Sequence, residues 1–549
     1  MPTATDSQHS HDGIEMDALG LTRHVSARAI PSSGQTIPEA IALACAEWPD
    51  REALVSRHAR YTFSELAREI NAATHALAAL GVRAGDRVAA TNPNYSEILI
   101  AFFAAQSLGA IWIGVNRPLA TPEKYFILND CEANYYLADN VSGQQIAEIR
   151  STLPALRRII SMEPDDSEGE WAKMVAAHRG AAPLDITIDP FAPAGIAYTS
   201  GTTGFPKGVV HSQHNMLMVG AMQKLGAGLS MPVERAGVIL PLTILNLIVL
   251  GPLAFLQSGR TSVLIDRIDA PGLAAWIRDE RVETFAAVPT IIHDLLTDPA
   301  VADTDLATLK FPGVGGAPVP EKFRDLYRQK FGHEIRTGYG LTEAPTSVCQ
   351  GDTSQPVTPG SSGAPLRHLR ISIQDEQGLS LPTGESGEIC ISGAIDGEFA
   401  GLYTPMLGYW RRPEATATAL RGGWLHTGDI GRVDAAGNLY VEGRRNDVIL
   451  RGGANVYPAE IERVLIANDA VADAAVIGRE DDRLGERVVA VIQLGRGDIE
   501  QDAVRELLQA SCLQQLARYK VPEEWVFVDS MPRNAMNKVV KSELKKALF

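Results

Sequence analysis

Short apolar runs alternate with longer amphipathic stretches through most of this chain, and this alternation limits its fold more than any other feature. RVAATN occupies 87–92, TSVLID at 261–266 precedes APGLAAWIRDERV, and TFAAVP at 284–289 precedes TIIHDLLTDPAV. The short runs have the length and composition of buried strands, and the longer ones have a helical period. We therefore predict an α/β fold with layered, mostly parallel sheets.

The pattern changes twice toward the C-terminus. From about residue 370, short strands separated by glycine follow one another, as in LRISIQDEQG, GEICISG and GNLYVEG. After GRRNDVILRGG comes a helix, strand, strand, helix order over PAEIERVLIAN, DAAVIGR, RVVAVIQL and DAVRELLQAS. Since 549 residues exceed what one core usually holds, we predict a large domain over 1–443, with a β-rich module at about 370–443, and a small α+β domain over 447–549.

Charge and cysteine content exclude several classes of protein. The formal net charge of −16 argues against a general nucleic-acid or anionic-membrane surface. The cysteines are odd in number and contain no CxxC pair, so they indicate neither a disulfide framework nor a zinc site and fit a reducing cytoplasm.

The polar, acidic first residues do not resemble a signal peptide. Two uncharged runs, 98–116 and 238–256, are interpreted as buried core elements and not as membrane spans.

One stretch, YTSGTTGFPKGVVHSQHN at 198–215, has the composition of an anion-binding loop. A strand over 195–198 and a helix from Asn215 would place TSGTTGFPKG in the turn between them. Glycines let several backbone N–H groups point inward, hydroxyl groups add donors, and Lys207 supplies a positive charge. Together these groups suit a polyphosphate. The loop is not a Walker loop, because Pro206 stands where that motif requires glycine.

This loop resembles the phosphate loop of the adenylate-forming superfamily, which includes acyl-CoA synthetases, adenylation domains and beetle luciferases. Five further motifs follow in that family's order: GGAP at 315–318, GYGLTE at 338–343, GWLHTGD at 423–429, GRRNDVILRGGANVYPAEIE at 443–462 and PRNAMNK at 532–538. The resemblance runs from about Tyr61 almost to the last residue. It implies a two-domain enzyme that joins a carboxylate to AMP.

The residue types suit this chemistry. A carboxylate must become a mixed anhydride before it can donate its acyl group, and bringing it against a triphosphate opposes two anions. Catalysis therefore requires charge neutralisation and in-line positioning by a divalent cation and lysines.

The resemblance assigns roles to individual residues. Glu343 would help to hold Mg²⁺, Thr342 would contact the α-phosphate, and Lys538 would bridge the acyl carboxylate and the α-phosphate. Asp429 would accept from both ribose hydroxyls, with Arg444 nearby. The phosphates of ATP would contact Thr199, Ser200, Gly201, Thr202, Thr203, Gly204 and Lys207. At the adenine site, Tyr339 would stack on the base, and the site would also comprise Gly340, Gly315, Gly316 and Ala317.

The resemblance also implies a second half-reaction, in which the small C-terminal domain turns about a hinge and coenzyme A displaces AMP. Gly453 would then lie beside the pantetheine tunnel. The chain departs from the family pattern at the hinge, where it has Asn446, and before the catalytic lysine, where it has Asn537. A third departure is Thr243-Ile244, which replaces an aromatic-histidine pair.

That third departure bears on the substrate. The segment that usually helps to wall the acyl pocket is apolar here, with Leu242, Ile244, Leu245, Leu247 and Ile248. No arginine in it would pair a second carboxylate, which favours an apolar monocarboxylic acid.

We therefore predict an AMP-forming acid:CoA ligase that uses ATP, Mg²⁺ and coenzyme A and has no integral membrane span. One alternative is an adenylating enzyme that delivers the acyl group to a carrier protein, or oxidises it as luciferases do. Another is a catalytically inert nucleotide-binding regulator. His211 and His214 are expected to be surface or helix-capping groups, and no role is assigned to them.

Overall fold

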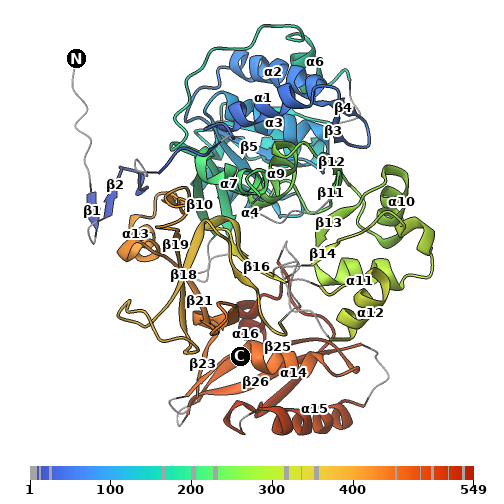
Figure 1. Cartoon of the computed structure of the whole chain (residues 1–549), viewed down its shortest axis with the longest axis vertical. Helices are drawn as coiled ribbons and strands as arrows, with labels where there is room; N and C mark the ends of the chain where they lie inside the picture. Colours follow the sequence, from blue (N-terminus) through green and yellow to red (C-terminus); the bar gives the residue numbers. More distant parts are fainter. Residues whose placement is uncertain are drawn as a thin grey trace.

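The computed structural model describes residues 9–11, 14–23, 27–31, 33–163, 167–199, 206–226, 233–314, 321–335, 337–351, 358–451, 454–481, 484–495, 500–516, 518–534 and 538–549. Figure 1 shows the two large sheets and their helices in the upper part and the C-terminal segment, in orange and red, at the bottom. Strands β18, β19 and β21 lie between them on the left.

The first large sheet has seven strands in the order β20-β10-β9-β6-β5-β7-β8. Strands β9, β6, β5, β7 and β8 run parallel. At one edge, β10 pairs antiparallel with β9, and β20 pairs antiparallel with β10. The bounds are β20 (Gly408–Tyr409), β10 (Lys207–Ser212), β9 (Pro193–Thr199), β6 (Ile111–Gly114), β5 (Arg87–Thr91), β7 (Tyr135–Ala138) and β8 (Arg158–Ser161).

The second sheet has six strands in the order β14-β13-β11-β12-β3-β4, all parallel except β4. The bounds are β14 (Gly313–Val314), β13 (Thr284–Ala287), β11 (Arg235–Val238), β12 (Thr261–Leu264), β3 (Glu52–Val55) and β4 (Arg60–Thr62). The predicted α/β architecture with mostly parallel sheets is confirmed.

Alternate residues of each strand face opposite sides, so each sheet has two faces that pack against other elements. Helices cover both faces of each sheet and form three layers. One hydrophobic cluster joins both sheets to the helices between them, and two further clusters cover the outer faces. The middle layer includes α1 (Ile37–Glu47), α2 (Phe63–Ala79), α3 (Ser96–Ser107) and α7 (Gln213–Lys224). The outer layers include α4 (Thr121–Asp130) and α5 (Asn140–Ala147) on one side, and α10 (Ala270–Glu280), α11 (Pro289–Thr297) and α12 (Glu321–Phe331) on the other. A shorter helix, α6 (Glu170–Ala176), packs against α2.

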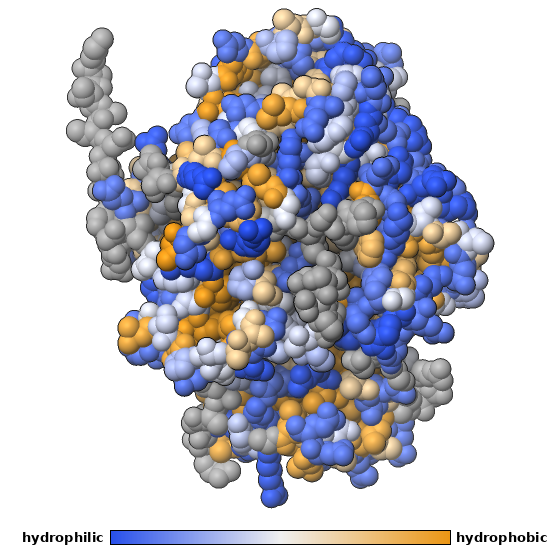
Figure 2. Space-filling model, in the orientation of Figure 1, coloured by the Kyte–Doolittle hydropathy of each residue, from blue (hydrophilic) through white to orange (hydrophobic). Residues whose placement is uncertain are grey.

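Both long uncharged runs lie largely in this core. The first forms α3 and β6, and the second is broken into α8 (Leu245–Ile248), the π-helix η2 (Val249–Leu253) and α9 (Ala254–Gln257). Within the described residues, no helix combines the length and the apolar character that crossing a membrane requires. Hydrophilic residues cover much of the face in Figure 2.

Smaller sheets follow the two large ones. A three-stranded sheet contains β15 (Gly338–Leu341), β16 (Ala344–Gln350) and β17 (Ala364–Pro365), and a four-stranded one contains β18 (Leu369–Gln374), β19 (Gly387–Gly393), β21 (Leu425–Val433) and β22 (Leu439–Arg444). Helix α13 (Pro413–Ala419) packs beside β20, and β1 (His9–His11) pairs with β2 (Ile14–Met16).

The C-terminal segment has hydrophobic clusters of its own. Its five-stranded sheet contains β23 (Ile449–Arg451), β24 (Ala454–Val456), β25 (Val471–Asp481), β26 (Gly485–Leu494) and β27 (Glu524–Val528). Its helices are α14 (Pro458–Ile466), α15 (Gln501–Gln515) and α16 (Lys541–Leu548). The short 3-10 helix η5 (Arg445–Asp447) lies at the expected linker. The domain limits at 443 and 447 stay a prediction.

One local prediction is wrong. The phosphate-loop stretch was expected to join a strand directly to a helix, but Lys207–Ser212 forms β10, which pairs antiparallel with β9. The stretch therefore connects two strands of a hairpin, and α7 begins only at Gln213. The reason is tertiary: β10 is held between β9 and β20, a partner that lies far away in the sequence.

Candidate active site

Asp429 lies at the centre of a cluster of polar groups in the ladder between β21 and β22. It pairs with Arg444 in this ladder, and Arg444 Nε is 2.9 Å from Oδ1. The hydroxyl of Tyr339, on β15, donates to Oδ2 at 2.6 Å. Asp429 is 5% exposed. Burial raises the pKa of Asp429, while Arg444, the Tyr339 hydroxyl and Lys538 oppose this increase.

Lys538 reaches the same cluster from the end of the chain. Removal of water lowers the pKa of Lys538, Arg444 lowers it further, and Asp429 acts in the opposite direction. Its backbone N–H donates to Asn534 Oδ1 at 3.0 Å, while the residue as a whole remains accessible to solvent. Direct contacts therefore join Tyr339, Asp429 and Arg444, and the charges of Asp429 and Arg444 act on Lys538 from nearby.

A second cluster joins Lys207 to Glu343 through Tyr409. The Tyr409 hydroxyl donates to Glu343 Oε1 at 2.8 Å, and Lys207 Nζ lies 5.2 Å from the centre of the Tyr409 ring. Burial and the charge of Glu343 raise the pKa of Tyr409, so its hydroxyl stays a proton donor. Sequence reasoning missed Tyr409, whose only signal was the short run Gly408-Tyr409-Trp410.

Strand register explains this second cluster. Val209 of β10 lies opposite Tyr409, and Lys207 lies opposite Thr199. Because residues two apart in a strand share a face, Lys207, Thr199 and Tyr409 point to the same side of the sheet. The hydroxyl of Thr199 donates to the Lys207 carbonyl oxygen at 3.4 Å.

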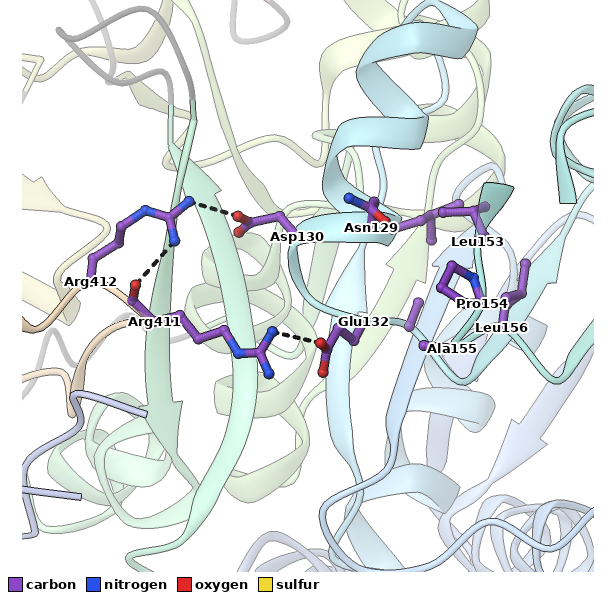
Figure 3. Close-up of a pocket in the computed structure, with 11 residues that line it drawn as sticks. Asn129, Asp130, Glu132, Leu153, Pro154, Ala155, Leu156, Arg411 and Arg412 are labelled. Carbon is purple, nitrogen blue, oxygen red and sulfur yellow. Dashed lines mark hydrogen bonds and ion pairs between the residues drawn. The ribbon is translucent and has the colours of Figure 1, made fainter. Parts of the chain in front are cut away.

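The opposite face of the same strands carries Tyr198 and Trp410. Both bind Asp130, whose Oδ2 accepts from the Tyr198 hydroxyl at 2.7 Å and whose carbonyl oxygen accepts from the Trp410 indole at 3.1 Å. Figure 3 shows the adjoining pocket of about 330 Å³, in which Arg412 pairs with Asp130 and Arg411 with Glu132. Both arginines are already paired with carboxylates, and none of the residues that line this pocket belongs to the two clusters above.

His211 and His214 are buried in the core, so the expectation of surface groups is wrong. Both side chains are 0% exposed. Burial lowers the pKa of His211 to about 3, and its ring lies against the backbone of Thr342. His214 Nε2 donates to the Leu402 carbonyl oxygen at 2.7 Å, which fixes the segment leading to β20. His211 therefore packs against Thr342, next to Glu343.

Glu388 is another residue that sequence reasoning missed. This buried carboxylate accepts from the Gly428 N–H at 3.1 Å, directly before Asp429, and from His426 Nδ1 at 3.0 Å. Cys390 also lies near His426, which makes the three side chains a potential metal cluster. However, Arg421 already binds Glu388 at 3.2 Å, and burial raises the pKa of the Cys390 thiol to about 12. Glu388 therefore supports the Asp429 turn.

The predicted acyl wall is only partly accessible. Leu242, Leu245 and Ile248 are buried in the core, whereas Ile244 and Leu247 are partly exposed and Leu250 is 36% exposed. Asn246 Nδ2 lies 3.5 Å from the carbonyl oxygen of Leu341, next to Thr342. Thr243 is buried and donates to Asn116 Oδ1 at 3.1 Å, so it faces away from the exposed apolar positions.

Several predicted residues lie outside the described part of the chain: Ser200, Gly201, Thr202, Thr203, Gly204, Gly315, Gly316, Ala317, Gly453 and Asn537. Gly340 lies in β15, next to Tyr339. Asn446 lies in η5.

Comparisons with known proteins agree with this arrangement. Residues 41–410 match the family described as AMP-binding enzyme, and residues 460–538 match the AMP-binding enzyme C-terminal domain. The chain therefore belongs to the AMP-binding enzyme family, and it is an adenylate-forming ligase.

Individual relatives cover nearly the whole chain. It is 33% identical over 496 residues to the Long-chain-fatty-acid--CoA ligase FadD13 of Mycobacterium tuberculosis (strain CDC 1551 / Oshkosh), covering 89% of this chain and 93% of that protein. It is 32% identical to the Fatty acid--[acyl-carrier-protein] ligase ScoC of Streptomyces coeruleorubidus, covering 93% and 96%. The anthranilate CoA ligase AuaEII, solved with anthranoyl-AMP, superposes with a TM-score of 0.83 at 26% identity, covering 93% and 97%.

Proposed function

We propose that this chain is an AMP-forming acid:CoA ligase. It joins an apolar monocarboxylic acid to the AMP part of ATP, releasing pyrophosphate, and coenzyme A then takes the acyl group from acyl-AMP, releasing AMP. The observation that carries this proposal is the buried cluster in which Asp429 pairs with Arg444 at 2.9 Å and accepts from the Tyr339 hydroxyl at 2.6 Å, with the charge of Lys538 also acting on Asp429. Such a convergence of two cations around one ribose-binding carboxylate suits a site that joins two anions.

Each described residue then has a role. Asp429 accepts from the ribose hydroxyls, and Arg444 neutralises it and binds the nucleotide. Tyr339 orients Asp429 through its hydroxyl and lies against adenine. Lys207 and Thr199 contact the outgoing phosphates, Thr342 contacts the α-phosphate, and Lys538 contacts the acyl carboxylate as the anhydride bond forms.

Glu343 suits a magnesium ion. Its carboxylate supplies the hard oxygen ligand that Mg²⁺ prefers, and its contact with the neutral Tyr409 hydroxyl leaves its negative charge uncompensated by that partner. Bound there, Mg²⁺ would neutralise phosphate charge.

The class of acid follows from the accessible wall. Ile244, Leu247 and Leu250 offer aliphatic surface, and Asn246 is the polar group near Thr342. This supports an aliphatic, alicyclic or aromatic tail without a second carboxylate. The relatives named for fatty acid and anthranilate ligases support the same class.

Acid-dependent exchange between pyrophosphate and ATP tests the first step, measured with Mg²⁺ across a panel of monocarboxylic and dicarboxylic acids. We expect exchange with apolar monocarboxylates only. Hydrolysis of ATP to ADP, or nucleotide binding without exchange, would contradict the proposal, and the latter would support the inert regulator.

The acceptor is tested separately. Coenzyme A and a phosphopantetheinylated carrier protein are offered to the acyl-AMP formed on the enzyme. We expect a thioester with coenzyme A, and transfer to the carrier alone would instead favour the function that the name of ScoC describes. A cytoplasmic location stays a prediction from cysteine usage.

A further inference from the structure

Tyr409 contacts two charged residues on which the proposed function depends. Its hydroxyl binds Glu343, and its ring lies against the ammonium group of Lys207. The backbone is also fixed, because the Tyr409 N–H donates to Thr416 Oγ1 at 2.9 Å. Pairing of β20 with β10 holds the ring on the face that carries Lys207. One aromatic side chain thus lies between a cation and an anion.

These two charges would otherwise attract each other. Among the ion pairs of the described residues, none joins Lys207 to a carboxylate, although Glu343 binds the same tyrosine. A direct pair would neutralise the lysine that phosphate requires and the carboxylate that a metal ion requires. A ring contact and a hydroxyl hydrogen bond leave both formal charges in place.

We propose that Tyr409 is a positioning residue that keeps Lys207 and Glu343 from pairing, so that the first stays available to polyphosphate and the second to a divalent cation. The inference rests on the proposed function, because that function gives both charges their ligands. It predicts that shortening Tyr409 lets the two charges collapse onto each other.

Binding of ATP without metal, measured by isothermal titration calorimetry in EDTA, tests this directly. We expect Tyr409→Leu to weaken metal-free ATP binding at least fivefold, because Glu343 then competes with ATP for Lys207. When Glu343→Gln is added to Tyr409→Leu, the affinity for ATP should return to within twofold of that of the Glu343→Gln single variant. If Glu343→Gln changes the affinity for ATP equally in the unsubstituted protein and in Tyr409→Leu, the inference is overturned.

A milder variant covers the case in which Tyr409→Leu fails to fold. Tyr409→Phe keeps the ring and removes only the donor to Glu343. We expect the Mg²⁺ concentration at half-maximal exchange to rise about three- to tenfold, with a smaller change in kcat. An unchanged Mg²⁺ requirement would contradict the role of the hydroxyl.

The matched control is Tyr198→Phe, which removes a tyrosine hydroxyl that binds Asp130 on the other face of the same strands. The effect of Glu343→Gln on ATP affinity should be the same with and without this change. An altered effect would show that any disturbance of these strands suffices, and would overturn the inference. Failure of the unsubstituted protein to bind ATP would overturn the proposed function itself.

Discussion

Asp429 is a carboxylate whose surroundings act in opposite directions on its charge. Burial raises its pKa, while Arg444, the Tyr339 hydroxyl and Lys538 lower it and Asp447 raises it. Protonation of Asp429 therefore begins at a higher pH than for an ordinary aspartate. In the proposed role, the ionised form offers both oxygens as acceptors to the ribose hydroxyls and attracts Arg444, whereas the protonated form carries a donor on one oxygen.

This predicts an acid-dependent KM for ATP. As pH falls through the raised pKa, Asp429 is protonated and the KM for ATP should increase. At higher pH the KM should reach a constant low value. Asp429→Asn should raise the KM at neutral pH about 10- to 100-fold, as for loss of a charge-assisted hydrogen bond, and should flatten its acid dependence. Initial rates of pyrophosphate exchange between pH 5 and 8 would measure both. The control is Asp396→Asn, an exposed carboxylate in the β-rich module, and an unaltered pH profile in Asp429→Asn would contradict the assignment.

At the residue scale, sequence motifs point to individual residues, but sequence reasoning failed where contacts between distant segments decide. Asp429, Arg444 and Tyr339 come from three motifs and contact one another, while the roles of these residues and of Lys538 stay predictions. Tyr409 and Glu388 were missed because each gains its meaning from a partner in another strand. The histidines were misjudged because an i, i+3 pair at a helix start gives no sign of the segment at 402–406 that covers it.

The β9–β10 hairpin is the element that places Lys207, and Gly208 allows its close packing. A Cβ atom at Gly208 would lie 2.7 Å from Ile196 Cγ2, 3.2 Å from Tyr198 Cζ and 3.4 Å from Trp410 Cβ. Glycine after the lysine is therefore required by the rings packed on the far face of the sheet, and phosphate binding need not be invoked for it.

Gly208→Ala is accordingly expected to destabilise the protein by about 1–3 kcal/mol, the usual cost of overpacking a filled core, and to weaken ATP binding by displacing Lys207. Thermal unfolding and ATP titration would measure the two effects. Gly143→Ala, in α5, is the matched control, because its Cβ would lie 3.7 Å from its nearest neighbours, Ala138 and Ile159, which is an ordinary contact distance. It should be neutral or stabilising. Unchanged stability in Gly208→Ala would contradict the packing argument.

Elements with a strong local pattern were predicted correctly. The strands at 87–91, 261–264 and 284–287 and the helices that follow have clear apolar periods. The strand at 207–212 was missed because its residues, KGVVHS, mix polar and apolar types and are held by β9 and β20. The π-helix at 249–253 has no sequence signal beyond Gly251-Pro252, where the backbone leaves helical geometry.

At the scale of the molecule, the proposed site draws its residues from three parts of the chain. Lys207 comes from the first large sheet, Asp429 from the four-stranded sheet, and Lys538 from the segment that follows the C-terminal sheet. A lysine carried by a separate part of the chain can serve one half-reaction and be absent from the other. The two steps should therefore be separable by substitution.

Lys538→Ala tests this separation. Acyl-adenylate formation should fall about 10²- to 10³-fold, because a positive charge is removed from the point where two anions meet. Thioester formation from supplied acyl-AMP should change much less, since no triphosphate is present in that step. Lys546→Ala, an exposed lysine of α16, is the control and should leave both rates unchanged. Equal losses in the two assays would mean that Lys538 supports the fold or both reactions, and would contradict a role confined to adenylation.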